Sequence, residues 1–318
     1  MEKNHYEPAT KPTLYFIGVT TSKSSIMNLF PKWADYLKLG DCEIKGVDFL
    51  PHDETEKYRE CVEFIKNDPL SKGALVTTHK IDIFLSCVDL FDHLDDHAKL
   101  MGEISCISKD GKKLLGHAKD SISSDSALNR ILPKDKWKGT NAEVLCLGAG
   151  GAATAILYNI NRQKQRGNQP SKIFVTDIKK SRLESIEQKY SQFKTNLPIE
   201  FHHCSKPKNN DDLAKNLKPY SLIINATGLG KDKPGSPLTW DVKYPQNSIV
   251  WELNYRGELI FLDQAEAQRN KKNLTIHDGW IYFIHGWLEV IAEVFQMEIK
   301  NSGDYFENLS EIAWSIRK

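Results

Sequence analysis

A short apolar run that ends in closely spaced glycines constrains this chain more than any other segment. Residues 144–153 read Val-Leu-Cys-Leu-Gly-Ala-Gly-Gly-Ala-Ala, and a helix-like run follows to Ile160. Glycines at such a turn let the backbone approach a phosphate, and the free amides and dipole of the next helix attract negative charge. An ordinary strand-to-helix turn would look the same. The interpretation we favour is a dinucleotide site at Gly148, Gly150, Gly151 and Ala152.

The segments after these glycines predict a parallel sheet. A polar insertion occupies 161–170, and apolar runs follow at 172–176, 221–227 and 248–253. Near-continuous apolar strands that alternate with helices are typical of a sheet covered on both faces. We therefore expect an α/β fold with a Rossmann-type, doubly wound domain.

Asp177 ends the second of these strands, where a carboxylate can accept hydrogen bonds from the adenosine ribose hydroxyls. The same carboxylate would repel the 2′-phosphate of NADP. The basic side chains of Lys179, Lys180 and Arg182 would offset only part of that repulsion. Exposed ion pairs recover about 1 kcal/mol or less, whereas the repulsion costs more. We predict NAD as the preferred cofactor, with NADP possible. A helix-capping aspartate is the alternative.

Composition limits the class of protein and the partners. The 318 residues suit two domains, and the net charge of +1, with acids and bases interspersed, indicates neither nucleic acid nor an anionic membrane as partner. No apolar run approaches the roughly 20 residues that span a bilayer. The first twelve residues are polar, so we expect a flexible tail rather than a signal peptide.

The cysteines and histidines do not predict a metal site. Six cysteines are scattered, which is typical of reduced thiols in a cytoplasmic protein. The motif at 202–204, His-His-Cys, and the pair His93 and His97 lack a partner set at zinc spacing. We therefore expect no bound metal.

Polar residues of the N-terminal half follow predicted strands. Ser22 and Ser24 come after the apolar run 14–19, where hydroxyls and free amides can bind a carboxylate, although helix capping would explain one of them. Lys80 follows the run 73–78, at the strand end where open sheets place their ligands. A solvated lysine is the alternative interpretation of Lys80.

An Asp-Gly pair at 110–111 predicts a tight hairpin between two strand-like runs, because it supplies positive φ angles. The hairpin brings Ser105 and Cys106 back toward Ala118 and Asp120. Asp120 precedes the next helical run, so a capping role is the alternative to a chemical one.

These segments, in this order, resemble the shikimate/quinate dehydrogenase family over about residues 18–295. The family's Ser-x-Ser carboxylate site resembles Ser22-Lys-Ser24. Its catalytic-lysine strand end resembles 75–80, with one residue missing and no proline, and its catalytic-aspartate turn resembles 117–120. The glycine loop and the segment Asn225-Ala-Thr227 complete the order of motifs.

The resemblance implies a nicotinamide-dependent dehydrogenase in which Lys80 and Asp120 handle the proton of a secondary alcohol. Its substrate would be a small cyclic hydroxy acid or cyclitol. The residues implied to bind substrate are Ser22, Ser24, Thr77, Ser105, Tyr255 and His285. The residues implied to bind cofactor are Gly148, Gly150, Gly151, Ala152, Asp177, Asn225, Thr227, Gly228 and Gly279.

Departures from the family pattern bear on the substrate. Two asparagines that hold substrate hydroxyls become Ser105 (or Cys106) and Ala118, and a late glutamine becomes His285. A site that binds a hydroxyl discriminates strongly by that hydrogen bond, so we expect a ring with substituents unlike those of shikimate. His285 as a satisfied core histidine is the other interpretation. A non-catalytic ligand-binding or regulatory derivative of the family is the alternative function.

The resemblance also implies the domain order. We expect a tail at 1–12, a discontinuous substrate-binding domain at 13–121 plus about 282–318, a dinucleotide-binding domain at 122–281, and a cleft between the two domains. The oligomeric state stays open between monomer and homodimer.

Overall fold

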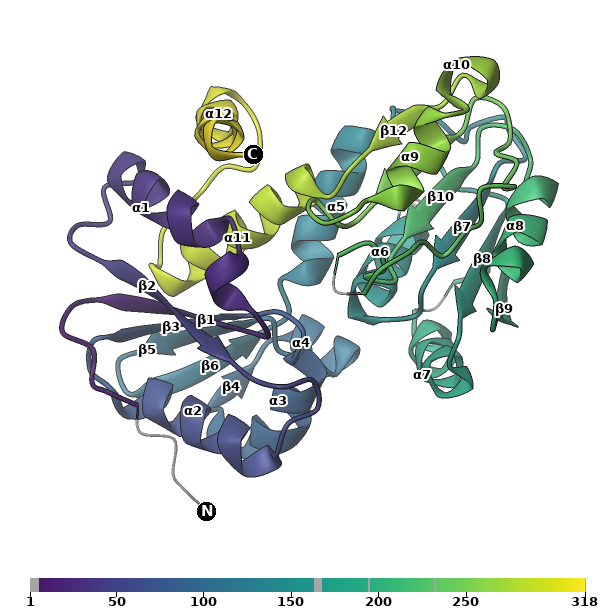
Figure 1. Cartoon of the computed structure of the whole chain (residues 1–318). Coiled ribbons are helices and arrows are strands. Elements are labelled where there is room, and N and C mark those ends of the chain that lie inside the picture. Colours follow the sequence, from purple (N-terminus) through teal and green to yellow (C-terminus); the bar gives the residue numbers. More distant parts are fainter. Residues whose placement is uncertain (1–5, 163–167, 194, 232, 318) are drawn as a thin grey trace. The chain divides into compact units, whose positions relative to one another are not determined.

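The computed structural model describes residues 6–162, 168–193, 195–231 and 233–317. The chain divides into two compact units (Figure 1). Unit 1 extends through Ile122 and resumes at Ile284, and unit 2 runs from Ser123 to Phe283. The boundaries therefore fall inside two helices, α5 (Asp120–Ile131) and α11 (Trp280–Val294).

Unit 1 is built on a mixed six-stranded sheet of order β2-β1-β3-β5-β6-β4. Its strands are β1 (Thr13–Gly18), β2 (Glu43–Asp48), β3 (Ser71–Val76), β4 (His93–Leu94), β5 (Cys106–Asp110) and β6 (Lys113–His117). β5 is antiparallel to both β3 and β6, so β1, β3 and β6 run in the same direction. Their carboxyl ends consequently lie along one edge of the sheet, and the hairpin at Gly111 (φ +59°) is confirmed.

Helices cover both faces of this sheet. Figure 1 shows α2 and α3 on one face, with α1 and the C-terminal part of α11 on the other. The helical segments are η1 (Thr21–Lys23), α1 (Ile26–Tyr36), α2 (Thr55–Asn67), α3 (Lys80–Cys87), η2 (Val88–Leu90), α4 (Asp96–Met101) and α12 (Asp304–Ile316). Apolar side chains of β1, α2 and β3 fill the core, among them Ile17, Val62 and Val76, which are fully buried. Pro31 lies inside α1, and it does not divide this segment into two helices.

The described part of the expected flexible tail makes packing contacts with unit 1. Tyr6 stacks on Phe64 with ring centroids 5.1 Å apart. The amide of Ala9 donates to Asp68 Oδ2 at 2.7 Å, and Ala9 is buried. An aromatic anchor and one backbone bond thus hold this segment on α2, whereas residues 1–5 of the expected tail lie outside the described residues.

Unit 2 confirms the predicted Rossmann-type, doubly wound parallel sheet, with strand order β12-β11-β10-β7-β8-β9. Its strands are β7 (Glu143–Leu147), β8 (Lys172–Asp177), β9 (Ile199–His203), β10 (Leu222–Asn225), β11 (Ile249–Glu252) and β12 (Thr275–His277). Its other helices are α6 (Gly151–Arg162), α7 (Lys180–Ser191), α8 (Pro207–Asn216), α9 (Ile260–Glu266) and α10 (Arg269–Lys272). The strand order reverses between β7 and β10, which is where such sheets bind their ligands. Residues 163–167 of the polar insertion lie outside the described residues.

No helix in the described part of the chain is both long and apolar enough to cross a membrane. The six cysteines form no disulfide, and five of them are buried.

Candidate functional site

Lys80 and Asp120 meet at the carboxyl edge of the unit 1 sheet. Lys80 opens α3 just after β3, and Asp120 opens α5 just after β6. The Lys80 ammonium donates a hydrogen bond to Asp120 Oδ2. Their side chains are 22% and 14% exposed, so the pair is mostly enclosed yet reachable. β5 lies between β3 and β6 and is antiparallel to both, so the carboxyl ends of β3 and β6 lie at the same edge of the sheet and bring these two residues together.

Charge around Lys80 keeps this side chain protonated. Burial by itself lowers the pKa of Lys80, but the attraction of Asp120 and then of Glu103 outweighs burial and raises it. Glu103 is buried and lies near the start of β5. The arrangement is therefore an ion pair that presents a proton donor, the ammonium, beside a carboxylate.

His79 fixes the backbone just before Lys80. His79 Nε2 lies 3.1 Å from the carbonyl oxygen of Gly18, and Nδ1 lies 2.9 Å from the Tyr58 hydroxyl. Burial lowers the pKa of His79, so the neutral ring donates from Nε2–H and accepts the Tyr58 proton. Sequence reasoning assigned no role to His79. Its contact with Tyr58 could not be predicted from the sequence, because Tyr58 lies in α2, more than twenty residues earlier.

Thr77 and Ser105, both expected to contact substrate, make internal hydrogen bonds. Thr77 Oγ1 donates to the carbonyl oxygen of Ile17 at 3.2 Å. Ser105 is buried, and its Oγ accepts the amide of Lys119 at 2.7 Å. Ser105 thus holds the turn that carries Asp120. The contact of either side chain with substrate stays a prediction.

The two serines of the expected carboxylate site lie beyond β1, at the same sheet edge. Ser22 is exposed within η1, whereas Ser24 is buried. The adjacent amide of Thr21 donates to Asp48 Oδ1 at 2.8 Å, which ties η1 to the end of β2. The exposed Ser22 hydroxyl is therefore the more accessible of the two for a ligand.

His285, the last of the residues expected to contact substrate, lies in α11 of unit 1. Its side chain is buried and stacks on Phe306 of α12, with ring centroids 4.4 Å apart and planes 14° apart. His285 therefore packs between α11 and α12, and its contact with substrate stays a prediction. At the next residue, Gly286, a methyl group would meet no atom within 4 Å, so that position of the helix is open.

The glycine loop of unit 2 has the geometry that a pyrophosphate needs. Gly148 adopts φ +101°, and a Cβ there would lie 2.7 Å from the Ala226 carbonyl oxygen, so only glycine fits. A Cβ at Gly150 would meet nothing within 4 Å. α6 begins at Gly151, so open space lies directly at a helix N-terminus. The loop therefore fits a dinucleotide.

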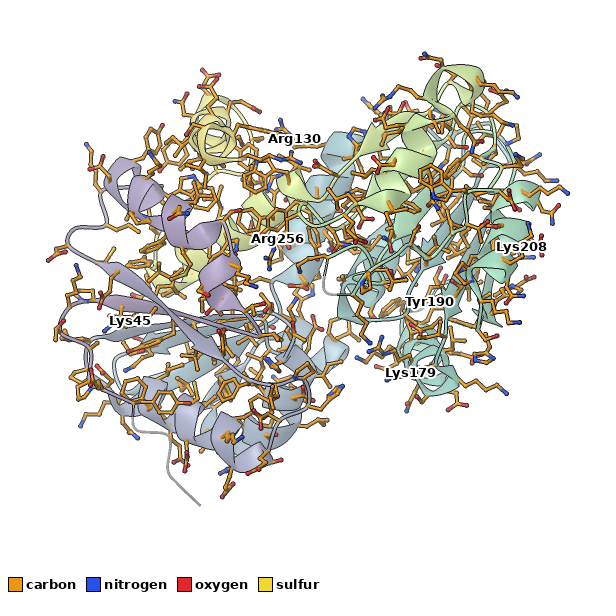
Figure 2. All side chains as sticks on the ribbon, viewed as in Figure 1. Lys45, Arg130, Lys179, Tyr190, Lys208 and Arg256 are labelled. Carbon is orange, nitrogen blue, oxygen red and sulfur yellow. The ribbon has the colours of Figure 1, made fainter. Side chains whose placement is uncertain are left out.

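Asp177 is turned toward this loop. Its Oδ2 accepts the amide of Ala149 at 2.9 Å, and its Oδ1 accepts the amide of Lys179 at 2.8 Å. Arg182 Nη1 lies 4.0 Å from the carboxylate. The side chains of Lys179, labelled in Figure 2, and of Lys180 and Arg182 are exposed around the end of β8. Asp177 thus supports the loop, and the outward surface here is basic.

A buried polar network follows β10 and β11. Asn225 Nδ2 donates to Glu252 Oε2 at 2.5 Å, and Thr227 Oγ1 donates to Asn225 Oδ1 at 2.6 Å. The amide of Asn254 donates to Glu252 Oε1 at 2.7 Å. Burial raises the pKa of Glu252 to about 7. Sequence reasoning missed Glu252, although an acid inside the apolar run Ile-Val-Trp-Glu-Leu was a usable signal.

Three further predicted residues lie around this network in unit 2. A Cβ at Gly279 would lie 1.9 Å from the Leu253 carbonyl oxygen, so the backbones approach too closely for any side chain. Gly228 adopts φ +75°. Tyr255 packs on Phe283 and Trp280, with ring centroids 4.5 and 5.2 Å apart.

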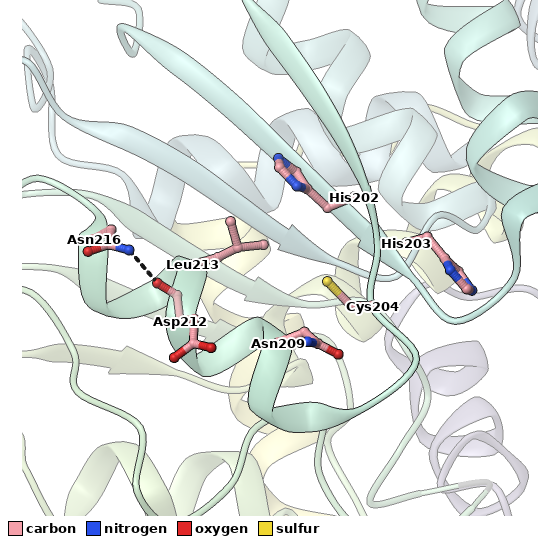
Figure 3. Close-up of a pocket in the computed structure, with 7 residues that line it drawn as sticks. All are labelled: His202, His203, Cys204, Asn209, Asp212, Leu213 and Asn216. Atoms are coloured by element: carbon pink, nitrogen blue, oxygen red, sulfur yellow. Dashed lines mark hydrogen bonds between the residues drawn. The ribbon is translucent and has the colours of Figure 1, made fainter.

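A separate pocket of about 320 Å³ lies between β9 and α8 of unit 2 (Figure 3). Its lining residues are His202, His203, Cys204, Asn209, Asp212, Leu213 and Asn216. His202 and His203 project to opposite sides of β9 in Figure 3 and bond to other partners, Glu200 Oε2 and the Ile178 carbonyl oxygen. None of the predicted site residues lines this pocket. Within the described residues, no three His, Cys, Asp or Glu side chains are grouped to hold a metal ion.

The fold and these two sets of residues define an α/β protein with a Rossmann-type dinucleotide-binding unit. No protein-family model matches the chain. Among curated proteins, it is similar to the shikimate dehydrogenases (NADP(+)) of Bartonella henselae, at 26% identity over 280 residues, and Bacillus subtilis, at 30% over 206 residues. The alignment with the Bartonella protein covers 86% of this chain and 84% of that protein. The alignment with the Bacillus protein covers 64% of this chain and 66% of that protein. The match to the Streptococcus thermophilus enzyme of the same name, at 27% identity, covers 57% of this chain and 59% of that protein.

Solved structures share the whole architecture. The shikimate dehydrogenase of Aquifex aeolicus superposes with a TM-score of 0.71 at 20% identity, covering 97% of this chain and 99% of the other. A quinate dehydrogenase of Corynebacterium glutamicum in complex with NAD gives 0.72 at 17% identity, covering 96% and 99%. The chain is thus similar to shikimate dehydrogenases over most of its length, in keeping with the order of its motifs.

Proposed function

We propose that this protein is an NAD(P)-dependent dehydrogenase that interconverts a secondary alcohol and a ketone on a shikimate-like cyclic hydroxy acid or cyclitol. The observation that carries the proposal is the contact between Lys80 and Asp120 at the carboxyl edge of the unit 1 sheet. The glycine loop of unit 2, with open space at Gly150, supplies the second requirement, a dinucleotide site. The relatedness to shikimate dehydrogenases supports both assignments.

The chain's own groups would manage the proton. When bound, the nicotinamide supplies or accepts the hydride. In ketone reduction the carbonyl oxygen gains negative charge as hydride arrives, and the Lys80 ammonium donates a proton to it. In alcohol oxidation the same pair accepts the hydroxyl proton. Because the Lys80 pKa is raised by Asp120 and Glu103 against burial, Lys80 is charged at neutral pH and ready to donate. Asp120 holds the ammonium in place.

For the cofactor, the geometry of Asp177 favours NADP more than the sequence suggested. We expected a carboxylate facing the ribose and hence NAD. Its two oxygens instead accept the amides of Ala149 and Lys179, while Lys179, Lys180 and Arg182 are exposed outside it. Several named relatives are NADP(+) enzymes. We propose that the basic side chains accept a 2′-phosphate and that NADP is used at least as well as NAD.

For the substrate, we propose a ring whose polar groups differ from those of shikimate. The side chain of Ala118 cannot hydrogen-bond a ring hydroxyl, and the hydroxyl of Ser105 accepts the Lys119 amide. Ser22, exposed at the same sheet edge, would anchor a carboxylate or similar group.

The experiment is a panel of cyclic hydroxy acids and cyclitols, and of their ketones, assayed with NAD and NADP through the absorbance of reduced nicotinamide. Turnover of at least one cyclic substrate that falls about a hundredfold in Lys80→Ala supports the proposal. Tight binding of ring compounds without any hydride transfer would favour the non-catalytic alternative.

A further inference from the structure

A closed ring of hydrogen bonds joins the loops that follow β10 and β11 in unit 2. Glu252, the last residue of β11, is fully buried and accepts the Asn225 side-chain amide at 2.5 Å and the Asn254 backbone amide at 2.7 Å. Asn225 Oδ1 accepts the Thr227 amide at 3.1 Å and the Thr227 hydroxyl at 2.6 Å. The Thr227 hydroxyl accepts the Leu229 amide at 3.1 Å. Asn254 Nδ2 closes the ring by donating to the Leu229 carbonyl oxygen at 3.0 Å.

The direction of these hydrogen bonds is determined by Glu252. An ionised carboxylate only accepts, so both of its oxygens can face N–H donors. Because the Asn225 amide group donates to Glu252, the Asn225 oxygen is turned to Thr227. A protonated acid or a glutamine would put a donor against one of the two N–H groups. Burial raises the pKa of Glu252 to about 7, and the hydrogen bonds from Asn254 and Asn225 act against burial. Above that pH the carboxylate fixes the orientation of Asn225.

The loop held by this ring lies directly against the glycine loop. A Cβ at Gly148 would lie 2.7 Å from the Ala226 carbonyl oxygen and 3.1 Å from the Thr227 amide nitrogen. The Ala226 amide donates to the carbonyl oxygen of the last residue of β7 at 2.7 Å. The Gly279 amide donates to the Asn254 carbonyl oxygen at 3.0 Å. The ring therefore contacts the glycine loop and Gly279 and includes part of the loop after β10, three segments expected to bind the cofactor.

We propose that Glu252 is a positioning residue of the dinucleotide site, whose carboxylate orients Asn225 and thereby holds the loop after β10 against the glycine loop. This inference rests on the proposed function, because it concerns the site assigned there to the cofactor. Glu252 is fully buried, so it acts on the nucleotide through Asn225 and Thr227 and not by contact.

The test measures NADP and NAD affinity by calorimetry at pH 8, where Glu252 is ionised. Glu252→Gln keeps the size of the side chain but leaves one acceptor oxygen for two N–H donors. Asn225→Asp places a second carboxylate against that of Glu252. Each single variant should bind both nucleotides about tenfold more weakly, the usual effect of leaving one buried donor or acceptor unsatisfied.

The double variant Glu252→Gln/Asn225→Asp exchanges the two groups and restores every hydrogen bond of the ring. The new amide at 252 donates to the new carboxylate at 225, whose other oxygen still accepts from Thr227, and the amide oxygen at 252 accepts from Asn254. Affinity should return to within about threefold of wild type. The comparison with Glu252→Gln is decisive, because it does not depend on the folding of Asn225→Asp alone. A double variant that binds no better than Glu252→Gln contradicts the proposal.

Asp211→Asn is the matched control for a general loss of stability in unit 2. Asp211 is buried, and its two oxygens accept the amide and the hydroxyl of Thr239 at 3.0 and 2.5 Å, outside the ring. This variant should unfold at lower denaturant concentration yet keep nucleotide affinity within about twofold of wild type. An equal loss of affinity in Asp211→Asn and Glu252→Gln would show that destabilisation alone weakens binding, and the proposal would be wrong.

The outcomes also separate this inference from the proposed function. A wild-type protein that binds neither NAD nor NADP overturns the proposed function, and the inference with it. A wild-type protein that binds nucleotide, alongside a Glu252→Gln variant that binds it equally well, overturns the inference alone.

Discussion

Lys80 and Asp120 are 40 residues apart in the chain, and the ammonium of the first donates a hydrogen bond to the carboxylate of the second. Lys80 is the first residue of α3, and Asp120 is the first residue of α5. Each helix follows a strand of the unit 1 sheet, β3 or β6, and these two strands run in the same direction on either side of the antiparallel β5. Neither helix alone suggests a reactive group. Together they create a charged pair in a mostly enclosed place, where a proton can be held and transferred.

Removing either member of this pair should slow catalysis without weakening nucleotide binding. Lys80→Ala and Asp120→Asn should each lower turnover by about a hundredfold, the usual effect of losing a general acid or base. The dissociation constant for NADP, measured by calorimetry, should change by less than about threefold, because the glycine loop is in the other unit. Wild-type-like turnover in both variants would remove the pair from the mechanism.

Gly150→Ala should separate folding from cofactor binding. A Cβ at Gly150 meets no protein atom within 4 Å, so we expect the free energy of unfolding to change by less than about 1 kcal/mol. The methyl group would occupy the space into which a pyrophosphate fits, so NAD(P) affinity should fall by about tenfold or more. Gly148→Ala is the contrast, because its positive φ and the 2.7 Å approach to Ala226 should destabilise the unit itself. Unchanged nucleotide affinity in Gly150→Ala would show that the cofactor lies elsewhere.

Glu252 should make stability depend on pH. Its pKa of about 7 in the folded protein exceeds the ordinary value of 4.5, because burial disfavours the charged form. The folded state therefore binds the proton more tightly, and this contribution to stability is fully present below about pH 4.5 and is lost as pH rises toward 7. The loss amounts to about 3 kcal/mol.

Glu252→Gln mimics the protonated acid and should remove this dependence. Denaturant unfolding of wild type and variant between pH 5 and pH 8 gives the difference, in which the other titrating groups cancel. The variant should gain stability relative to wild type as pH rises. A difference that is independent of pH, or of opposite sign, would place the Glu252 pKa near its ordinary value.

Arg182→Ala should weaken NADP but not NAD. Arg182 is exposed at the end of β8, near the Asp177 carboxylate, which already accepts the amides of Ala149 and Lys179. Losing the Arg182 guanidinium as a partner of the 2′-phosphate should lower NADP affinity by about tenfold. NAD affinity should stay within about twofold of wild type, because NAD lacks that phosphate. Asp177→Ala should instead weaken both nucleotides, because it frees the amide of Ala149. An Arg182→Ala variant with equal losses for the two nucleotides would show that Arg182 does not read the 2′-phosphate.

Much of the fold was predictable because local patterns determined it. The glycine loop after β7, the Asp-Gly hairpin and the positions of Lys80 and Asp120 at strand ends all follow from residues adjacent in sequence. The alternation of apolar runs and helices likewise predicted the parallel sheet of unit 2.

The residues that sequence reasoning missed or misplaced depend on contacts between distant segments. α11 is apolar almost all round at its start, so its sequence does not indicate that His285 faces Phe306 while Glu293 faces the turn at 117–120. The aromatic contact of Tyr6 with α2 likewise could not be predicted, because the N-terminal segment is polar overall. The direction of the Asp177 side chain could not be predicted, because a strand-end aspartate can turn either to a ribose or to a loop amide.

The central claim is hydride transfer governed by Lys80 and Asp120, and the most direct test follows reduced nicotinamide while the protein meets cyclic ketones and alcohols with NADP and with NAD. We predict turnover of at least one cyclic hydroxy acid or cyclitol by the wild-type protein. We also predict a loss of about a hundredfold in Lys80→Ala at unchanged nucleotide affinity. A protein that binds NADP normally yet oxidises and reduces none of these compounds, or whose turnover is indifferent to Lys80, would contradict the account.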